Sequence, residues 1–236
     1  MNLDVLNYDY IPKRIPYRMK EEREIMGEVQ KFLKFKNTRN LVIYGLPGIG
    51  KTLISKKIID ILDEELDGYI DYYNLWILND NEFVRKFAED CGIFFNANLT
   101  KSDVLDRVNE KITDEKTFSI LFLDEIDKIS DEQLIYILEE KLNAMFIFIT
   151  NDEDFFDKLD KRIVSRLNFL HVTFNPYKRN EIFGILNERV SALRLSIDKD
   201  VLDIIVNETY KRKDIRFGLF VIREMIINET EFNVKL

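Results

Sequence analysis

The clearest chemical signal in the chain is segment 45–52, which reads Gly-Leu-Pro-Gly-Ile-Gly-Lys-Thr. Its G-x-x-x-x-G-K-T spacing is that of a phosphate-binding loop, and it lies between an apolar run and a helical pattern, as that motif requires. Glycines let backbone N–H groups turn toward phosphate oxygens, and the N-terminus of the following helix favours an anion. We expect Lys51 to bridge the β- and γ-phosphates of a nucleotide and the Thr52 hydroxyl to hold Mg²⁺. The residues expected to bind nucleotide here are Gly45, Pro47, Gly48, Ile49, Gly50, Lys51, Thr52 and Leu53.

A second apolar run, 119–123, ends in the acidic pair Asp124-Glu125. Parallel strands buried on both faces read as continuous apolar runs, and open α/β sheets bind ligands at the carboxyl ends of such strands. We therefore expect Asp124 to contribute to the Mg²⁺ site and Glu125 to polarise the attacking water. The alternative, a surface acidic pair at a strand end, fits poorly with a phosphate-binding loop upstream.

Composition restricts the class of protein. The 236 residues carry a net charge of −8, which argues against broad nucleic-acid affinity, because such affinity depends on neutralising phosphates. No apolar run is long enough to cross a membrane, and no signal-peptide pattern begins the chain. The single cysteine, Cys91, excludes an intrachain disulfide and favours a reducing, cytoplasmic location. The only metal expected is nucleotide-bound Mg²⁺, and His171 is interpreted as a strand residue.

Periodicity predicts the elements that position these groups. Strands are expected at 41–44, 69–73, 120–123, 146–149 and 169–174, with helices at 20–35, 52–66, 81–91, 102–112 and 130–142, the last capped by Ser130. This alternation predicts an α/β fold with a parallel five-stranded sheet flanked by helices. After Pro176 only helical patterns follow, at 178–193, 198–210 and 215–227, with Asp198 and Asp214 as caps. We expect an α/β core over residues 1–175 and a small helical lid over residues 176–236.

Three further positions are candidates for the site, each with a structural alternative. Asn151 follows the fourth strand and would point at the γ-phosphate, although Asn-Asp is also a common turn. Arg162 and Arg166 would share one helix face and could reach the phosphates of a neighbouring subunit, or form an ordinary solvated face. Arg216, near a helix start, has an unfavourable position for the helix dipole, which indicates an anionic partner elsewhere or a local pair with Asp214.

The order of these parts resembles an AAA+ ATPase, and more narrowly the archaeal and eukaryotic origin-recognition initiators of the ORC/CDC type. Residues 9–18, Asp-Tyr-Ile-Pro-Lys-Arg-Ile-Pro-Tyr-Arg, are similar to the segment that this family places against adenine. The resemblance implies that Tyr10, Ile11, Pro12 and Arg18 contact the base, and that Tyr177 and Arg189 contact the nucleotide. It also implies that Asn74 restrains Glu125, that Asn151 and Arg216 sense the γ-phosphate, and that Arg162 or Arg166 is the arginine finger.

The resemblance implies a slow ATPase switch with ATP or ADP and Mg²⁺ as ligands, a homo- or hetero-oligomer formed through the arginine finger, and no membrane partner. Family initiators continue into a DNA-binding winged-helix domain that this sequence lacks, and no basic inserted helix lies between Asn74 and Ser119. DNA is therefore a weaker expectation than nucleotide. Alternatives are a clamp-loader or helicase-loader subunit, a scaffold that holds ATP without turnover, and a metabolite kinase.

Overall fold

The computed structural model describes residues 3–35, 39–95, 99–115 and 118–232. The chain divides into two compact units, which are described separately. The sheet unit comprises residues 22–44 and 55–173, and the helical unit comprises residues 1–21, 45–54 and 174–236. This division puts the phosphate-binding loop in the helical unit, and the expected boundary at residue 175 stays a prediction.

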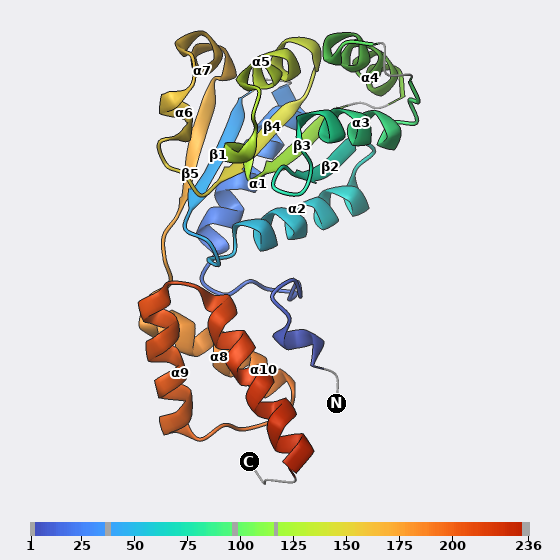
Figure 1. The fold of residues 1–236 in the computed structure, drawn as a ribbon. Coiled ribbons are helices and arrows are strands. Elements are labelled where there is room, and N and C mark those ends of the chain that lie inside the picture. The colour runs from blue at the N-terminus through green and yellow to red at the C-terminus, as the bar shows by residue number, and fades with distance from the viewer. Residues whose placement is uncertain (1–2, 36–38, 96–98, 116–117, 233–236) are drawn as a thin grey trace. The chain divides into compact units, whose positions relative to one another are not determined.

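Five parallel strands form the sheet in the order β2-β3-β4-β1-β5 (Figure 1). Their bounds are β1 Asn40–Gly45, β2 Tyr69–Asn74, β3 Ser119–Asp124, β4 Met145–Thr150 and β5 Phe169–Phe174. The register pairs Asn74 with Asp124 and Asp124 with Ile149, so the polar ends of β2, β3 and β4 meet at one edge. The predicted α/β fold with a five-stranded parallel sheet is confirmed.

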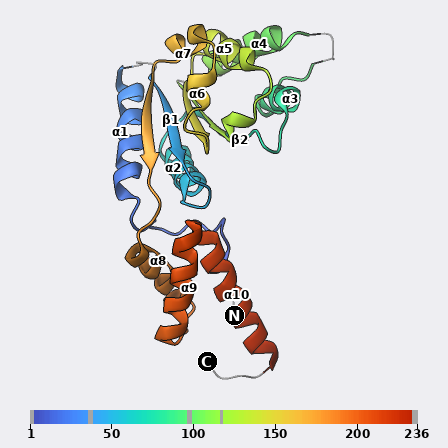
Figure 2. The same cartoon turned by 60° about the vertical axis from the view of Figure 1, so that its left-hand side comes forward.

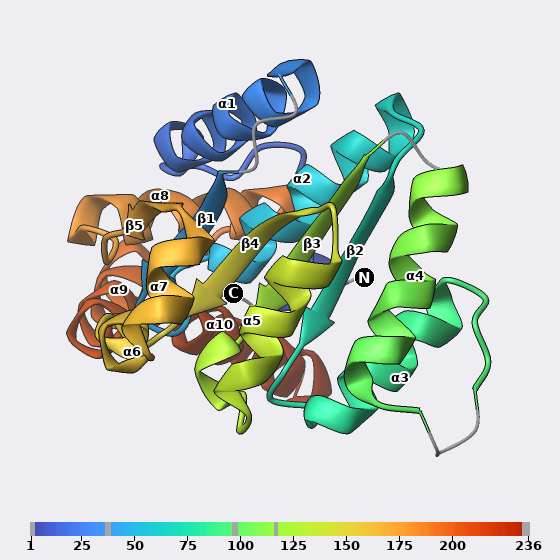
Figure 3. The ribbon, with the colours of Figure 1, turned by 90° about the horizontal axis from the view of Figure 1, so that it is seen from above.

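Helices cover both faces of the sheet (Figure 3). On one face, Val42, Leu121, Leu123, Phe146 and Phe148 pack with buried residues of α3 to α7. These helices are α3 Asp80–Asp90, α4 Lys101–Glu115, α5 Glu132–Lys141, α6 Phe155–Lys158 and α7 Lys161–Leu167. The other face carries α1 Met19–Phe35 and α2 Lys51–Glu65 (Figures 2 and 3). The continuous apolar runs of β3 and β4 follow from this double cover, because every side chain of both strands is buried.

Capping explains one difference from the sequence prediction. Helix α5 begins at Glu132, and its N-cap is Asp131, whose carboxylate accepts from the Gln133 N–H at 3.1 Å. The prediction that Ser130 caps this helix is wrong. Its hydroxyl instead donates to Asp80 Oδ2 at 2.7 Å and is therefore engaged with the start of α3. A carboxylate one residue later is an equally good cap, so the helix starts there.

The helical unit contains α8 Arg179–Ala192, α9 Lys199–Arg212 and α10 Ile215–Phe232, which pack against one another (Figure 2). The predicted C-terminal helical region is confirmed, and Asp198 caps α9 as expected. The short 3-10 helix η1, Asp4–Leu6, lies against α8 and α10, which joins the N-terminal segment to these helices. Asp214 precedes α10 and accepts from the Arg216 N–H at 2.9 Å, as a capping side chain does.

Candidate nucleotide-binding site

The phosphate-binding loop has the backbone that its sequence predicts. Gly48 and Gly50 adopt φ values of +72° and +96°, a region that L-residues with side chains rarely enter. Gly45 passes so close to β5 that a Cβ there would lie 2.7 Å from the Phe174 carbonyl oxygen. The three glycines are therefore required by conformation or by space, and the turn that they permit is of the kind that binds anions.

Lys51 lies at the first position of α2 and is buried, with 6% of its surface exposed. Its Nζ donates to the carbonyl oxygens of Gly45 at 2.6 Å and Leu46 at 3.0 Å. A buried ammonium beside a glycine turn at a helix N-terminus fits a phosphate group. Thr52 follows on α2 and is half-buried, so its hydroxyl belongs to the same segment.

Arg18 joins the N-terminal segment to this loop. It is 3% exposed, and its guanidinium donates to Ile49 O at 3.1 Å, to Asn175 O at 2.6 Å and to Glu21 Oε1 at 2.8 Å. The guanidinium also stacks 4.0 Å from the centroid of the buried Tyr177 ring. Burial raises the pKa of the Tyr177 hydroxyl, which keeps the phenol neutral. These contacts give Arg18 and Tyr177 a role in bracing the loop, and their direct contact with nucleotide stays a prediction.

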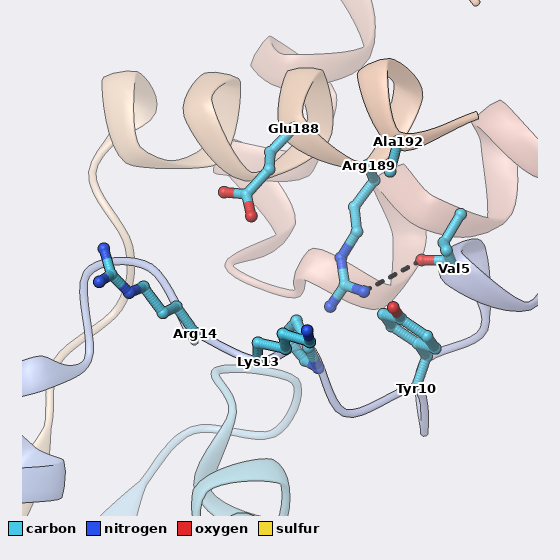
Figure 4. A pocket seen from close by; sticks show the side chains of 8 residues that line it. Val5, Tyr10, Lys13, Arg14, Glu188, Arg189 and Ala192 are labelled. Atoms are coloured by element: carbon cyan, nitrogen blue, oxygen red, sulfur yellow. Dashed lines mark hydrogen bonds between the residues drawn. The ribbon is translucent and has the colours of Figure 1, made fainter. Parts of the chain in front are cut away.

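A cavity of about 400 Å³ lies between the N-terminal segment and α8 (Figure 4). Arg189 lies 4.9 Å from the centroid of the Tyr10 ring and donates to Val5 O at 3.2 Å. Burial lowers the pKa of the Arg189 guanidinium below its ordinary value. The volume is within the range of small-molecule sites. Tyr10 and Pro12, predicted to contact the base, line the cavity, and so does Arg189, predicted to contact the nucleotide. Ile11 is half-buried without lining it, and Arg18 does not line it either. Lys13, Arg14 and Glu188 also line it and were not predicted.

Arg216 forms the local pair that the sequence left as an alternative. Its guanidinium donates to both carboxylate oxygens of Asp214, with Nε at 2.9 Å from Oδ1 and the second terminal nitrogen at 2.7 Å from Oδ2. The same carboxylate lies against the loop, since a Cβ on Gly48 would fall 1.8 Å from Asp214 Oδ1. The Ile215 N–H donates to Gly48 O at 3.1 Å. The start of α10 is thus bonded directly to the phosphate-binding loop.

In the sheet unit, the acidic pair lies at the end of β3. Asp124 is 3% exposed; its Oδ1 accepts from the Glu125 N–H at 2.9 Å, and its Oδ2 accepts from the Tyr72 hydroxyl at 2.5 Å. Glu125 has φ 55° and ψ 43°, a left-handed conformation that is uncommon for a residue with a side chain. Such strain is common at functional sites, because the surrounding structure must enforce it.

The polar residue that holds Glu125 is Asn151. Its Nδ2 donates to Glu125 Oε2 at 2.6 Å. The predicted restraint of Glu125 by Asn74 is wrong in this structure, since the Asn74 side-chain oxygen accepts from the Trp76 N–H at 2.9 Å. An asparagine two residues before a free N–H readily closes such an Asx turn, and this local bond determines where Asn74 points.

Both candidate arginine fingers lie on α7. Arg162 pairs with Asp160 through Nε at 3.0 Å and its terminal nitrogen at 2.7 Å. Arg166 is exposed, and its guanidinium lies 4.8 Å from the centroid of the Tyr136 ring and donates to the Tyr136 hydroxyl at 2.8 Å. Tyr136 of α5 thus contacts Arg166 through both a hydrogen bond and a cation–π interaction.

Sequence reasoning missed Tyr72 and Tyr136. Tyr72 precedes Asn74 by two residues, so strand alternation puts both on one face of β2, and this signal was available. Tyr136 lies in an ordinary helical pattern, and nothing in the sequence distinguishes it. Among the described residues there is no group of three or more metal-ligating side chains, and no described helix could span a membrane.

A model of the AAA family, the ATPase family associated with various cellular activities, matches residues 41–174. ORC1-type DNA replication proteins are similar to this chain: that of Desulfurococcus amylolyticus is 31% identical over 80% of the chain and 52% of its own length. That of Halobacterium salinarum is 28% identical over 84% of the chain and 65% of its own length. The chain thus spans about half to two thirds of these relatives.

Solved structures show the same fold. The Aeropyrum pernix ORC1 protein, solved in complex with DNA, superimposes with a TM-score of 0.86 at 23% identity, covering 99% of this chain and 65% of that one. Cdc6p from Pyrobaculum aerophilum superimposes with a TM-score of 0.85 at 20% identity, covering 99% and 67%. The chain resembles the ORC/CDC-type initiators, as its motifs predict. Because the family model covers more than half of its residues, the chain belongs to the AAA ATPase family.

Proposed function

We propose that this protein binds ATP with Mg²⁺, hydrolyses it slowly, and acts as a nucleotide-dependent switch of the replication-initiator type. The observation that carries the proposal is the glycine loop with positive φ at Gly48 and Gly50 and the buried Lys51 ammonium at the start of α2. The similarity to ORC1-type replication proteins supports the initiator role and makes DNA a candidate partner. The proposal keeps the cytoplasmic location expected from the cysteine content.

In this proposal, the loop N–H groups and Lys51 bind the phosphates. Thr52 and Asp124 would hold Mg²⁺, which neutralises charge on the β- and γ-phosphates. Glu125 would orient the attacking water and accept its proton as the water oxygen bonds to the γ-phosphorus and the bridging P–O bond breaks. The bond from Asn151 restricts the orientation of the Glu125 carboxylate, which supports this role. The Tyr10–Arg189 cavity supports binding of the base.

Arg166 is the better candidate for a finger that acts on the nucleotide of a neighbouring subunit. Its stacking on Tyr136 reduces the conformational entropy lost when it meets a phosphate, whereas Arg162 would first have to leave Asp160. A finger in trans makes turnover depend on assembly, which is how ATP would control an oligomer. The clamp-loader or helicase-loader alternative shares this chemistry and differs in the partner.

The test is nucleotide content and ATP turnover of the purified chain, with and without duplex DNA. Lys51→Ala should abolish both bound nucleotide and turnover. Lys57→Ala is the matched control, because Lys57 lies on the same helix but pairs with Glu22 at 2.6 Å. A DNA effect on turnover supports the initiator or loader role. Bound nucleotide without turnover favours the scaffold alternative, and the absence of both refutes the proposal.

A further inference from the structure

Tyr72 contacts the buried carboxylate of Asp124 from the neighbouring strand. Its hydroxyl donates to Asp124 Oδ2 at 2.5 Å, within the range of a charge-assisted O–H···O⁻ bond. The strand register explains this contact. Asn74 pairs with Asp124, and Tyr72 lies two residues earlier on the same face of β2, so its long side chain reaches along the strands to the carboxylate.

The second oxygen of the same carboxylate is also held. Asp124 Oδ1 accepts from the Glu125 N–H at 2.9 Å. Two donors on opposite oxygens restrict rotation of the carboxylate plane. Each carboxylate oxygen can accept more than one hydrogen bond or ligand, so the Tyr72 bond does not by itself exclude a metal ion.

The ring of Tyr72 is supported in turn from α2. Lys56 Nζ lies 5.6 Å from the ring centroid, a distance at which a cation and an aromatic face attract each other. Lys56 follows Thr52 by four residues, so helical periodicity puts both on one face of α2. The tyrosine therefore contacts both the acidic end of β3 and Lys56 of α2.

The adjacent tyrosine differs in this respect. Tyr73 points to the opposite face of β2, and its hydroxyl lies 2.9 Å from Asp71 Oδ2 and 3.1 Å from Asp90 Oδ2. It packs in the core against Phe83 and Phe87. Tyr73 thus stabilises the sheet–helix contact, whereas the Tyr72 hydroxyl ends on a residue of the candidate site.

We propose that Tyr72 is a positioning residue that presets the Asp124 carboxylate for the Mg²⁺ ion of bound nucleotide. This inference rests on the proposed function, and it assigns Tyr72 a role that no motif gives it. Residues that hydrogen-bond a metal ligand orient it, and removing them weakens metal affinity by about 10- to 100-fold. A fixed carboxylate also loses less rotational freedom when the metal binds.

The test is the metal affinity of the full chain saturated with ADP. Mn²⁺ replaces Mg²⁺ in oxygen-ligand sites and is measured directly, as free Mn²⁺, by electron paramagnetic resonance. We expect Tyr72→Phe to weaken Mn²⁺ binding about 10-fold while ADP binding in EDTA is unchanged. Tyr73→Phe is the matched control, which should lower the melting temperature without changing Mn²⁺ affinity.

Each result is decisive. If Tyr72→Phe changes only the melting temperature, the tyrosine is structural and the inference is overturned. If Mn²⁺ binds more tightly in Tyr72→Phe, the hydroxyl competes with the metal, and the inference is again wrong. If the unsubstituted chain has no ADP-dependent Mn²⁺ site, the proposed function itself fails, which distinguishes that failure from the failure of the role of Tyr72.

Discussion

The pair between Arg216 and Asp214 should limit how strongly the protein distinguishes ATP from ADP. Arg216 is the predicted γ-phosphate sensor, yet both oxygens of Asp214 accept hydrogen bonds from its guanidinium. A γ-phosphate must therefore compete with a carboxylate that lies against the Gly48 turn. Asp214→Asn removes the competing charge and keeps a side-chain oxygen that can cap α10, since Asn and Asp are equivalent N-caps.

The size of the expected change in ATP affinity follows from how exposed the Arg216–Asp214 pair is. The side chains of Arg216 and Asp214 are 49% and 29% exposed, so solvent screens the interaction strongly. Exposed ion pairs contribute at most about 1 kcal/mol, and the two-point geometry puts this one near that limit. Because about 1.4 kcal/mol corresponds to a tenfold change in affinity, about 1 kcal/mol predicts ATP binding roughly 5-fold tighter in Asp214→Asn. ADP has no γ-phosphate to bind Arg216, so its affinity should change less than that of ATP.

The chain supplies its own control for this substitution. Asp160 caps α7 and pairs with Arg162 in the same arrangement, with the Arg162 N–H at 2.8 Å and Nε at 3.0 Å from Asp160 Oδ1. Asp160→Asn removes the same charge from the same kind of helix start in the sheet unit. Titration calorimetry with ADP and a non-hydrolysable ATP analogue, at low and high salt, gives the four affinities for each variant. High salt should reduce the gain in ATP affinity in Asp214→Asn, because salt screens exposed charges.

The reasoning is refuted if the ratio of the ADP and ATP dissociation constants is unchanged in Asp214→Asn, or if Asp160→Asn shifts it equally. In an Arg216→Ala background, Asp214→Asn should no longer tighten ATP binding, because Asp214 is expected to act on ATP only through Arg216. An additive double variant would show that Asp214 acts on nucleotide without Arg216.

The pair also predicts a pH dependence of stability. Burial raises the pKa of the Asp214 carboxyl, but the hydrogen bonds from Arg216 outweigh burial and bring the pKa below its ordinary value of 3.8. A depressed carboxyl pKa adds stability above the unfolded pKa, and this stability is lost as the pH falls through the folded value. The difference in unfolding free energy between the unsubstituted chain and Asp214→Asn should therefore shrink below about pH 4, as measured by urea denaturation.

Three more predictions test separate parts of the structure. Gly48→Ala should weaken ADP binding roughly 5- to 30-fold, measured by calorimetry, because it adds about 1–2 kcal/mol of left-handed strain. Its Cβ would also displace the Asp214 carboxylate. Arg166→Ala should lower turnover by about 10³-fold or more if Arg166 acts as a finger, and should remove the dependence of turnover on protein concentration, whereas Arg162→Ala should keep both. Equal losses in the two variants would contradict this assignment. Asn40→Ala should lower the free energy of unfolding, measured by urea denaturation, by about 3 kcal/mol. The Asn40 side chain is fully buried, accepts from the Phe146 N–H at 2.8 Å and donates to Leu167 O at 2.7 Å. A loss under 1 kcal/mol would show that these groups find other partners.

Most of the fold was predictable because its signals are local. The buried strands β3 and β4 are continuous apolar runs, and β5 begins and ends where its pattern does. The α5 start was misplaced by two residues because Ser130 and Asp131 are both good caps by type. The structure distinguishes them because the Ser130 hydroxyl donates to the Asp80 carboxylate, which is fifty residues away in the sequence.

The site was predictable where its chemistry follows from one segment. The loop glycines, Lys51 and the Asp124-Glu125 pair are local patterns at strand ends, and all lie where their strands require. The partner of Glu125 was assigned wrongly, because Asn74 ends β2 and Asn151 follows β4, and both strands flank β3. Which asparagine reaches Glu125 depends on the turn that follows each strand, and the Trp76 N–H engages Asn74.

The two Asp-x-Arg helix starts show why residue type does not assign a role by itself. Residues 160–162 and 214–216 form the same cap and the same ion pair. Their difference lies in what the carboxylate touches: Asp214 lies against Gly48, and the next N–H donates to the Gly48 carbonyl oxygen. A phosphate bound in that turn changes the field at Asp214 directly and thereby the start of α10. If Arg216 senses nucleotide, Asp214 is therefore the residue through which the loop and the helix respond together, and the selectivity of Asp214→Asn measures that coupling.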